Sequence, residues 1–194
     1  MPYRILRFIG FLICKIFFRI KVKGLENIPA RGNFIITANH SSYLDPVAIG
    51  VAVPRRIKWI VRKDVYDVRW LKPLLESLGM IRENGSVGKA LDLLIKGESV
   101  GVFPEGARSP DGKLGEGKKG VAIMALRSGV PVVPCAVGGA FKAYPRGVVF
   151  PRPYPVEIII GKAIKPGKSD APDEKTIDST LAEIMTAIGS LMEQ

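Results

Sequence analysis

The chain has 194 residues, of which 47% are hydrophobic and 24% are charged. That length suits one domain with a substantial core, and the composition excludes an intrinsically disordered chain. The formal net charge of +11 favours an anionic partner, which is a nucleic acid, an acidic membrane surface or a phosphorylated substrate. The two cysteines, Cys14 and Cys135, lie far apart without a C-x-x-C pair, so neither a disulfide framework nor a zinc site is expected.

Residues 2–20 are too apolar for a normal surface helix, yet basic residues interrupt them. Their longest uncharged run, residues 8–14, is far shorter than the roughly 20 residues that span a bilayer. On a helical wheel, apolar side chains fill most of the circumference, and a sector of about 120° holds Arg4, Arg7, Lys15 and Arg19. The pattern predicts an amphipathic membrane-anchor helix in the interface over residues 1–22, ahead of one domain over residues 23–194.

Three other interpretations of this N-terminal segment stay open. A secretory signal would need a small-residue cleavage site, and Lys15 lies where its apolar core should continue. A membrane-spanning helix would let its basic ends snorkel to the interface. A helix docked on the protein's own core needs fewer apolar side chains than this segment carries.

After the anchor, short apolar runs alternate with segments of helical spacing. Strands are predicted over 33–38, 57–61, 99–103, 130–137 and 156–160. Helices are predicted over 46–53, 70–78, 87–95 and 117–127, and a core-packing helix near the end carries Ile177, Leu181, Ile184, Ile188 and Leu191. The proline-rich residues 143–155 predict a rim loop. This alternation predicts an α/β fold, with a mixed, mainly parallel sheet flanked by helices.

His40 is the only histidine in the chain, and it follows the predicted strand 33–38 directly. Asp45 and Pro46 are typical of a helix start, with Asp45 as the N-cap and Pro46 in the first turn. In the simpler interpretation, Asp45 caps a helix and His40 is a polar loop residue. In the other, Asp45 accepts a hydrogen bond from one ring nitrogen and leaves the second nitrogen free as a general base. The two interpretations are compatible.

A second group of polar residues follows the predicted strand 99–103 in the same way: Glu105, Gly106 and Arg108. Loops at the carboxyl ends of strands tend to line one crevice in α/β sheets, so both groups can face one pocket. Gly106 allows close backbone approach, and the planar fork of Arg108 suits a phosphate. A surface ion pair between Glu105 and Arg108 is the alternative.

Together, these two motifs resemble those of the glycerolipid acyltransferase family, especially the lysophosphatidic acid (1-acyl-sn-glycerol-3-phosphate) acyltransferases. The motifs are Asn39-His40-Ser41-Ser42-Tyr43-Leu44-Asp45-Pro46 and Phe103-Pro104-Glu105-Gly106-Ala107-Arg108-Ser109. Two later segments also resemble blocks of the family: Lys118-Lys119-Gly120 and Val130-Pro131-Val132-Val133-Pro134. The resemblance covers residues 24–164.

Two positions depart from the family pattern. Ala107 stands where the family usually has threonine, so a hydroxyl contact is absent there. The intermediate block commonly ends in an aspartate-arginine pair, and residues 79–85 replace it here. Arg82 is the best match in that block for the arginine that binds the substrate phosphate.

The resemblance implies transfer of an acyl group to the 2-hydroxyl of 1-acyl-sn-glycerol 3-phosphate, forming phosphatidic acid in phospholipid biosynthesis. The donor would be an acyl thioester, either acyl-CoA or acyl carrier protein, with no metal and no cofactor. His40 would act as the general base and Asp45 would orient it. Glu105 and Gly106 would shape the acceptor site, and Arg108 and Arg82 would hold the phosphate. The enzyme would be membrane-associated on the cytoplasmic face of the cell membrane, the inner membrane in a bacterium.

Other functions fit parts of the pattern. The same chemistry could act on another acceptor, such as glycerol 3-phosphate or a lyso-ornithine lipid. A thioesterase would use Cys135 as nucleophile with His40, although a cysteine in an apolar strand is typically a small core residue. The charge suits a nucleic-acid binder, but the chain has no basic-aromatic recognition motif, so no nucleic-acid partner is expected.

Overall fold

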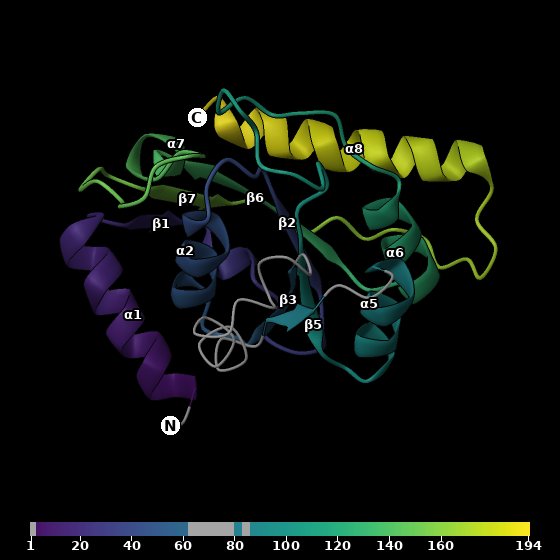
Figure 1. Ribbon diagram of the computed structural model, residues 1–194. Coiled ribbons are helices and arrows are strands. Elements are labelled where there is room, and N and C mark those ends of the chain that lie inside the picture. Colours follow the sequence, from purple (N-terminus) through teal and green to yellow (C-terminus); the bar gives the residue numbers. More distant parts are fainter. Residues whose placement is uncertain (1–2, 62–79, 83–85) are drawn as a thin grey trace.

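One sheet forms the centre of the computed structural model, which describes residues 3–61, 80–82 and 86–194 (Figure 1). Within these residues, seven strands lie in the order β1-β7-β6-β2-β5-β3-β4. The strands are β1 (Lys21–Lys23), β2 (Ile35–Ala38), β3 (Ile57–Val61), β4 (Ile81–Arg82), β5 (Ser99–Val102), β6 (Val132–Gly138) and β7 (Glu157–Ile160). All neighbours pair in parallel except β6 and β7. The predicted mixed, mainly parallel sheet is confirmed.

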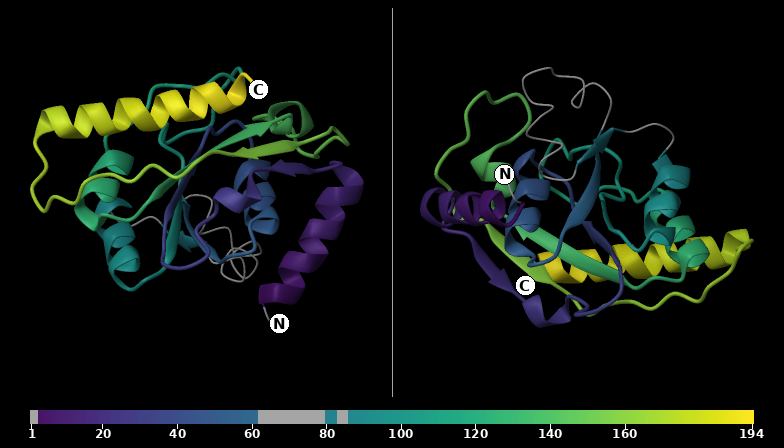
Figure 2. Two further views of the ribbon diagram at one scale, coloured as in Figure 1. Left: turned by 180° about the vertical axis from the view of Figure 1, so that it is seen from behind. Right: turned by 90° about the horizontal axis from the view of Figure 1, so that it is seen from below.

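Helices cover both faces of this sheet (Figure 2). They are α1 (Tyr3–Phe17), α2 (Leu44–Ala52), α5 (Ser86–Ile95), α6 (Gly120–Ser128), the short α7 (Ala140–Ala143) and α8 (Glu174–Met192), with a 3-10 turn η1 (Leu25–Asn27). The core therefore divides in two: α1 and α2 pack on one face, and α5, α6 and α8 pack on the other. Successive side chains of strand β2 point to opposite faces of the sheet: Ile36 packs with α1 and α2, and Ile35 packs with α5, α6 and α8.

The predicted strands agree with the observed ones to within about two residues, which is the usual uncertainty of element ends. The predicted helix 70–78 lies outside the described residues. The helix predicted over 117–127 begins only at Gly120, and the N–H of Lys118 before it donates to the carbonyl of Pro104 at 2.8 Å. Gly129 ends this helix in the left-handed conformation with φ 69°.

The N-terminal helix α1 packs against α2 with one face and exposes an apolar face on the other side. Cys14 and, just after the helix, Phe18 are buried in the core, and Gly10 lies close to the side chain of Val51. The outward face carries Ile5, Phe8, Ile9, Leu12, Ile13, Ile16 and Phe17. No helix among the described residues is both long and apolar enough to cross a membrane. The predicted boundary after residue 22 falls inside β1, which pairs with β7.

The predicted basic sector of this helix is wrong for Arg7. Its guanidinium points inward and donates to the carbonyls of Val51 and Val53, at 3.3 and 3.2 Å. A cation at this position satisfies carbonyls left over at the end of α2 and interacts favourably with the helix dipole. A helical wheel assigns Arg7 to the polar sector because it contains no information about α2.

Candidate active site

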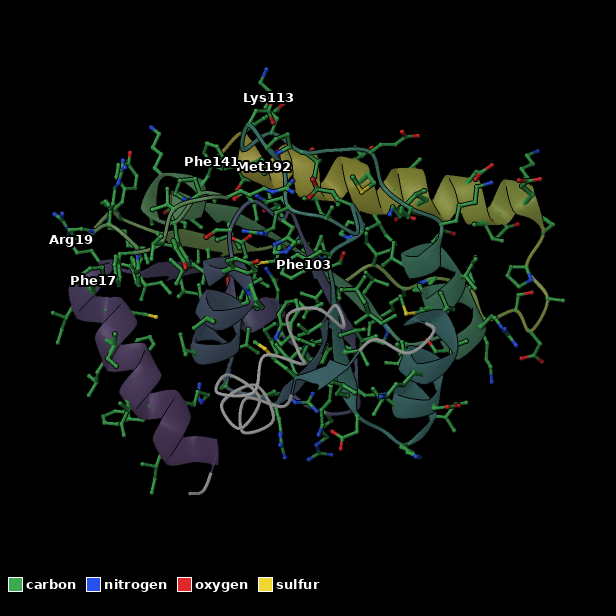
Figure 3. The ribbon with its side chains drawn as sticks, viewed as in Figure 1. Phe17, Arg19, Phe103, Lys113, Phe141 and Met192 are labelled. Atoms are coloured by element: carbon green, nitrogen blue, oxygen red, sulfur yellow. The ribbon has the colours of Figure 1, made fainter. Side chains whose placement is uncertain are left out.

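The two motifs meet at one edge of the sheet. Strands β2 and β5 are parallel neighbours, so the segments that follow them leave the sheet on the same side. Phe103 is the first residue after β5, and Figure 3 shows it near the centre of the molecule. The loop that starts at Asn39 lies beside it, because the N–H of Ser109 donates to the carbonyl of His40 at 2.7 Å.

His40 and Asp45 form the hydrogen bond that the sequence predicted. Nδ1 of His40 lies 2.9 Å from Oδ2 of Asp45, whose side chain is completely buried, while the His40 ring is 16% exposed. Because an ionised carboxylate only accepts, Nδ1 must be the donor. In a neutral imidazole, Nε2 then carries the free lone pair, which is the arrangement a general base requires.

The prediction that Asp45 is the N-cap of the following helix is wrong. Helix α2 begins at Leu44, and the hydroxyl of Ser42 accepts the N–H of that residue at 3.1 Å. The Asp45 carboxylate turns back instead, and its Oδ2 accepts the N–H groups of Ser41 and Ser42, both at 2.7 Å. The carboxylate that bonds His40 is thus fixed by the backbone of the intervening turn.

Glu105 connects the loop after β5 to the loop after β2 by hydrogen bonds. Oε1 accepts the backbone N–H of His40 at 2.7 Å, and Oε2 accepts that of Gly115 at 2.8 Å. Burial raises the pKa of Glu105, and these two hydrogen bonds oppose part of that shift. Among the described residues Glu105 makes no ion pair with Arg108, so this alternative is wrong. The side chain positions His40.

Arg108 lies over a ring that belongs to the first motif. Its guanidinium carbon is 3.5 Å from the centroid of the Tyr43 ring, which is cation–π distance. Stacking uses the face of the guanidinium and leaves its N–H edge available for an anion. The structure therefore places the Arg108 guanidinium beside the His40 loop, and its role in phosphate binding stays a prediction.

Arg82 is placed only through its backbone. It lies in β4 and pairs with Val61 at the edge of the sheet, where β3 and β5 separate β4 from β2. Its side chain is outside the described part of the structure. A role in phosphate binding stays a prediction.

Sequence reasoning missed an aromatic stack behind His40. The ring of Phe103 lies 3.9 Å from the His40 ring at 12°, and the ring of Trp59 lies 4.9 Å from Phe103 at 20°. The stack depends on Gly101, which pairs with Trp59, because a Cβ there would lie 2.5 Å from the Trp59 ring. A tryptophan opposite a glycine on neighbouring strands indicates such a stack, but this pair can be recognised only when the strand register is known.

Asn39 also has a role that the motif did not reveal. Its side-chain amide donates to the carbonyl of Val137 at 3.1 Å, and its oxygen accepts the N–H of Val137 at 2.8 Å. This pair continues the hydrogen bonding between β2 and β6 beyond the end of β2. It holds the residue before His40 against the sheet.

A hollow of about 160 Å³ opens beside Ser41, on the β6 side of the His40 loop. Apolar side chains, glycines and a few polar groups line it, and Figure 3 shows two of the apolar side chains, Phe141 and Met192, close together below Lys113. Ser41 thus contributes its N–H to Asp45 and lines this hollow as well.

Cys135 does not have the surroundings of a nucleophile. Its side chain is completely buried in β6. Burial raises the pKa of the thiol far above its ordinary value, and the negative charge of Asp45 adds to that shift. The reactive form of cysteine is the thiolate, so the structure gives no support to a thioesterase that uses Cys135.

A mainly parallel sheet that carries a histidine bonded to a buried carboxylate at its carboxyl edge is an arrangement that suits an enzyme using a general base. The chain belongs to the acyltransferase family, whose model, described as Acyltransferase, matches residues 19–138. The resemblance drawn from the motifs is therefore confirmed.

The proteins similar to this chain include two sequence relatives and one solved structure. A chloroplastic 1-acyl-sn-glycerol-3-phosphate acyltransferase of Arabidopsis thaliana is 31% identical over 140 residues, which are 68% of this chain and 39% of the plant protein. The 1-acyl-sn-glycerol-3-phosphate acyltransferase of Bacillus subtilis is 34% identical over 128 residues, covering 62% and 63%. The crystal structure of the 1-acyl-sn-glycerophosphate acyltransferase PlsC from Thermotoga maritima superposes with a TM-score of 0.82 at 26% identity, covering 98% of this chain and 78% of that one. The chain spans less than two thirds of the length of either sequence relative.

Proposed function

We propose that this chain transfers an acyl group from an acyl thioester to the 2-hydroxyl of 1-acyl-sn-glycerol 3-phosphate, forming phosphatidic acid. The observation that carries the proposal is the 2.9 Å contact between His40 and the buried Asp45 at the carboxyl edge of the sheet. The acceptor is inferred from the names of the plant, Bacillus and Thermotoga relatives.

The chemistry requires two proton transfers through His40 and one acyl transfer. Nε2 of His40 removes the proton of the 2-hydroxyl while that oxygen attacks the thioester carbonyl, and the C–S bond breaks as the new C–O bond forms. The protonated imidazole then supplies the proton that the departing thiolate takes up. Asp45 stabilises the imidazolium in between, and the stack on Phe103 fixes the plane of the ring.

The remaining site residues position the acceptor and the base. In this proposal, the N–H edge of Arg108 binds the acceptor phosphate with the help of Arg82, and Glu105 and Gly106 keep the loop in place. Direct transfer of this kind uses the thioester as its only co-substrate and needs no metal or cofactor. Either acyl-CoA or acyl carrier protein supplies the acyl group.

We further propose that the chain works on the cytoplasmic face of a membrane, the inner membrane in a bacterium. The exposed apolar face of α1 supports the membrane association, because an apolar helix face that no described residue covers suits the headgroup region of a bilayer. The loop between α7 and β7 adds a second patch with the exposed Val149 and Phe150. Figures 1 and 2 place this loop beside the Phe17 end of α1, so one bilayer surface can contact both.

Replacing Phe8 and Ile16 together with glutamate is expected to weaken binding to vesicles more than tenfold. Each large apolar side chain contributes about 1.5–3 kcal/mol when fully buried, and an anionic leaflet repels each new carboxylate. Co-sedimentation with phosphatidylglycerol vesicles measures the effect. Ile95→Glu is a matched control, since Ile95 and Ile16 are both 79% exposed but Ile95 lies in α5, away from α1 (Figure 1). Equal binding by the double variant and the control would rule out α1 as the anchor.

Incubating detergent-solubilised protein with lysophosphatidic acid and a labelled acyl thioester is expected to yield labelled phosphatidic acid. Parallel reactions with acyl-CoA and with acyl carrier protein identify the donor. Glycerol 3-phosphate and a lyso-ornithine lipid as acceptors test the alternative reactions. Transfer to one of these and not to lysophosphatidic acid would replace the proposed acceptor, and thioester hydrolysis without any transfer would refute the proposal.

A further inference from the structure

Two adjacent lysines before α6 have different surroundings. Nζ of Lys119 lies 2.7 Å from Glu174 and 2.9 Å from Asp178, both on α8. Lys118 is exposed and makes no ion pair with any residue that the structure describes. Within the described part of the chain, the first lysine of this pair therefore has no carboxylate partner, while the second links the start of α6 to α8.

The side chain of Lys118 lies across the Glu105-Gly106 turn. A Cβ on Gly106 would lie 2.8 Å from Nζ, 3.1 Å from Cε and 3.2 Å from Cδ of the lysine, so its arm extends over the glycine. Gly106 also has φ 70°, in the left-handed region that favours glycine. The backbone of Lys118 is fixed to the same turn, since its N–H donates to the carbonyl of Pro104 at 2.8 Å.

This turn is the one that holds the base. Glu105 accepts the N–H of His40, and Phe103 stacks on its ring. The ammonium group of Lys118 is therefore next to the residue that follows Glu105, while the carboxylate of Glu105 itself is engaged by two backbone N–H groups. Glu105 therefore makes no ion pair with this lysine.

Arg108 follows in the same loop, and no ion pair with a described residue engages it. One cation therefore lies over Gly106 and the other belongs to Arg108, two residues later in the loop whose Glu105 bonds the His40 backbone. A phosphate monoester carries up to two negative charges and several acceptor oxygens, which suits one guanidinium and one ammonium together.

We infer that Lys118 binds the phosphate of the acceptor lipid together with Arg108, and that Gly106 is a glycine so that the lysine can cross the turn. The inference rests on the proposed function for the identity of the acceptor. Coenzyme A also carries phosphates, so its binding is the other source that a test must separate.

Lys118→Met is expected to raise the KM for lysophosphatidic acid about tenfold, the typical effect of losing a hydrogen bond to a charged group. The KM for the acyl donor should stay unchanged, and Lys118→Arg should restore most of the affinity. Lys119→Met is the matched control and should leave both KM values as they are. With 1-monoacylglycerol, which has no phosphate, Lys118→Met and the unaltered chain should react at equal rates.

Calorimetric binding of sn-glycerol 3-phosphate gives a second measurement that does not depend on turnover. Weaker binding by Lys118→Met than by Lys119→Met supports the inference even if the unaltered chain fails to acylate lysophosphatidic acid, an outcome that would refute the proposed function alone. Equal binding by the two variants overturns the inference. A rise in the KM for acyl-CoA alone also overturns it, because the lysine would then bind the donor.

Discussion

Replacing His40 with alanine is expected to lower the rate of acyl transfer by about three orders of magnitude. A positioned general base contributes about 10²–10⁴-fold to such a reaction. The chain contains no second histidine that could take over. Single-turnover rates with saturating lysophosphatidic acid and acyl donor measure the chemical step directly.

His40→Asn separates loss of the base from loss of structure. Its amide can donate to Asp45 in place of Nδ1, so the buried carboxylate keeps a partner. We expect this variant to be as inactive as His40→Ala. Its midpoint of urea unfolding should be higher than that of His40→Ala. Activity within tenfold of the unaltered chain in either variant would show that His40 is not the base.

Asp45→Asn is expected to lower the rate by about two to three orders of magnitude and the free energy of unfolding by about 1–3 kcal/mol. The amide oxygen can still accept the N–H groups of Ser41 and Ser42, but a neutral acceptor forms weaker bonds than a carboxylate and cannot stabilise the imidazolium. The amide nitrogen would occupy the position of Oδ1, which has no hydrogen-bond partner among the described residues. Urea unfolding and single-turnover rates measure the two effects separately.

A double variant tests whether Asp45 acts through His40. Groups that work as one unit have non-additive effects on rate. His40→Ala/Asp45→Asn should therefore be no slower than His40→Ala alone. If the two losses multiply, Asp45 contributes to the rate independently of the histidine, and its assignment as an orienting residue is wrong.

The parts of the fold that could be read from the sequence are those with local signals. Strand 57–61 is apolar except for Lys58 and is rich in β-branched residues, and Gly129 ends α6 because glycine adopts a left-handed φ without strain. The C-terminal helix was predicted from its stripe, and Ile184, Ile188 and Leu191 are buried in it. The register of the sheet, including Trp59 opposite Gly101, has no such local signal.

The pairing of His40 with Asp45 was predictable because only five residues separate them, within one turn that starts at the end of a strand. The same holds for the position of Glu105 and Arg108 at the neighbouring strand's end. What each side chain contacts there was not predictable. Glu105 bonds the His40 backbone rather than Arg108, and Asp45 bonds the turn rather than capping α2.

The sequence therefore determined the kind of protein: its α/β alternation, its apolar N-terminal helix and the lone histidine with a carboxylate five residues later. Only the tertiary structure decided which polar groups work together. Arg7 points inward to α2. Lys118 and Lys119 are adjacent in the chain, yet Lys118 lies over Gly106 and Lys119 bonds α8. Residue type and local spacing fix the backbone conformation and the chemistry available, whereas the partner of a charged side chain depends on packing between segments distant in the sequence.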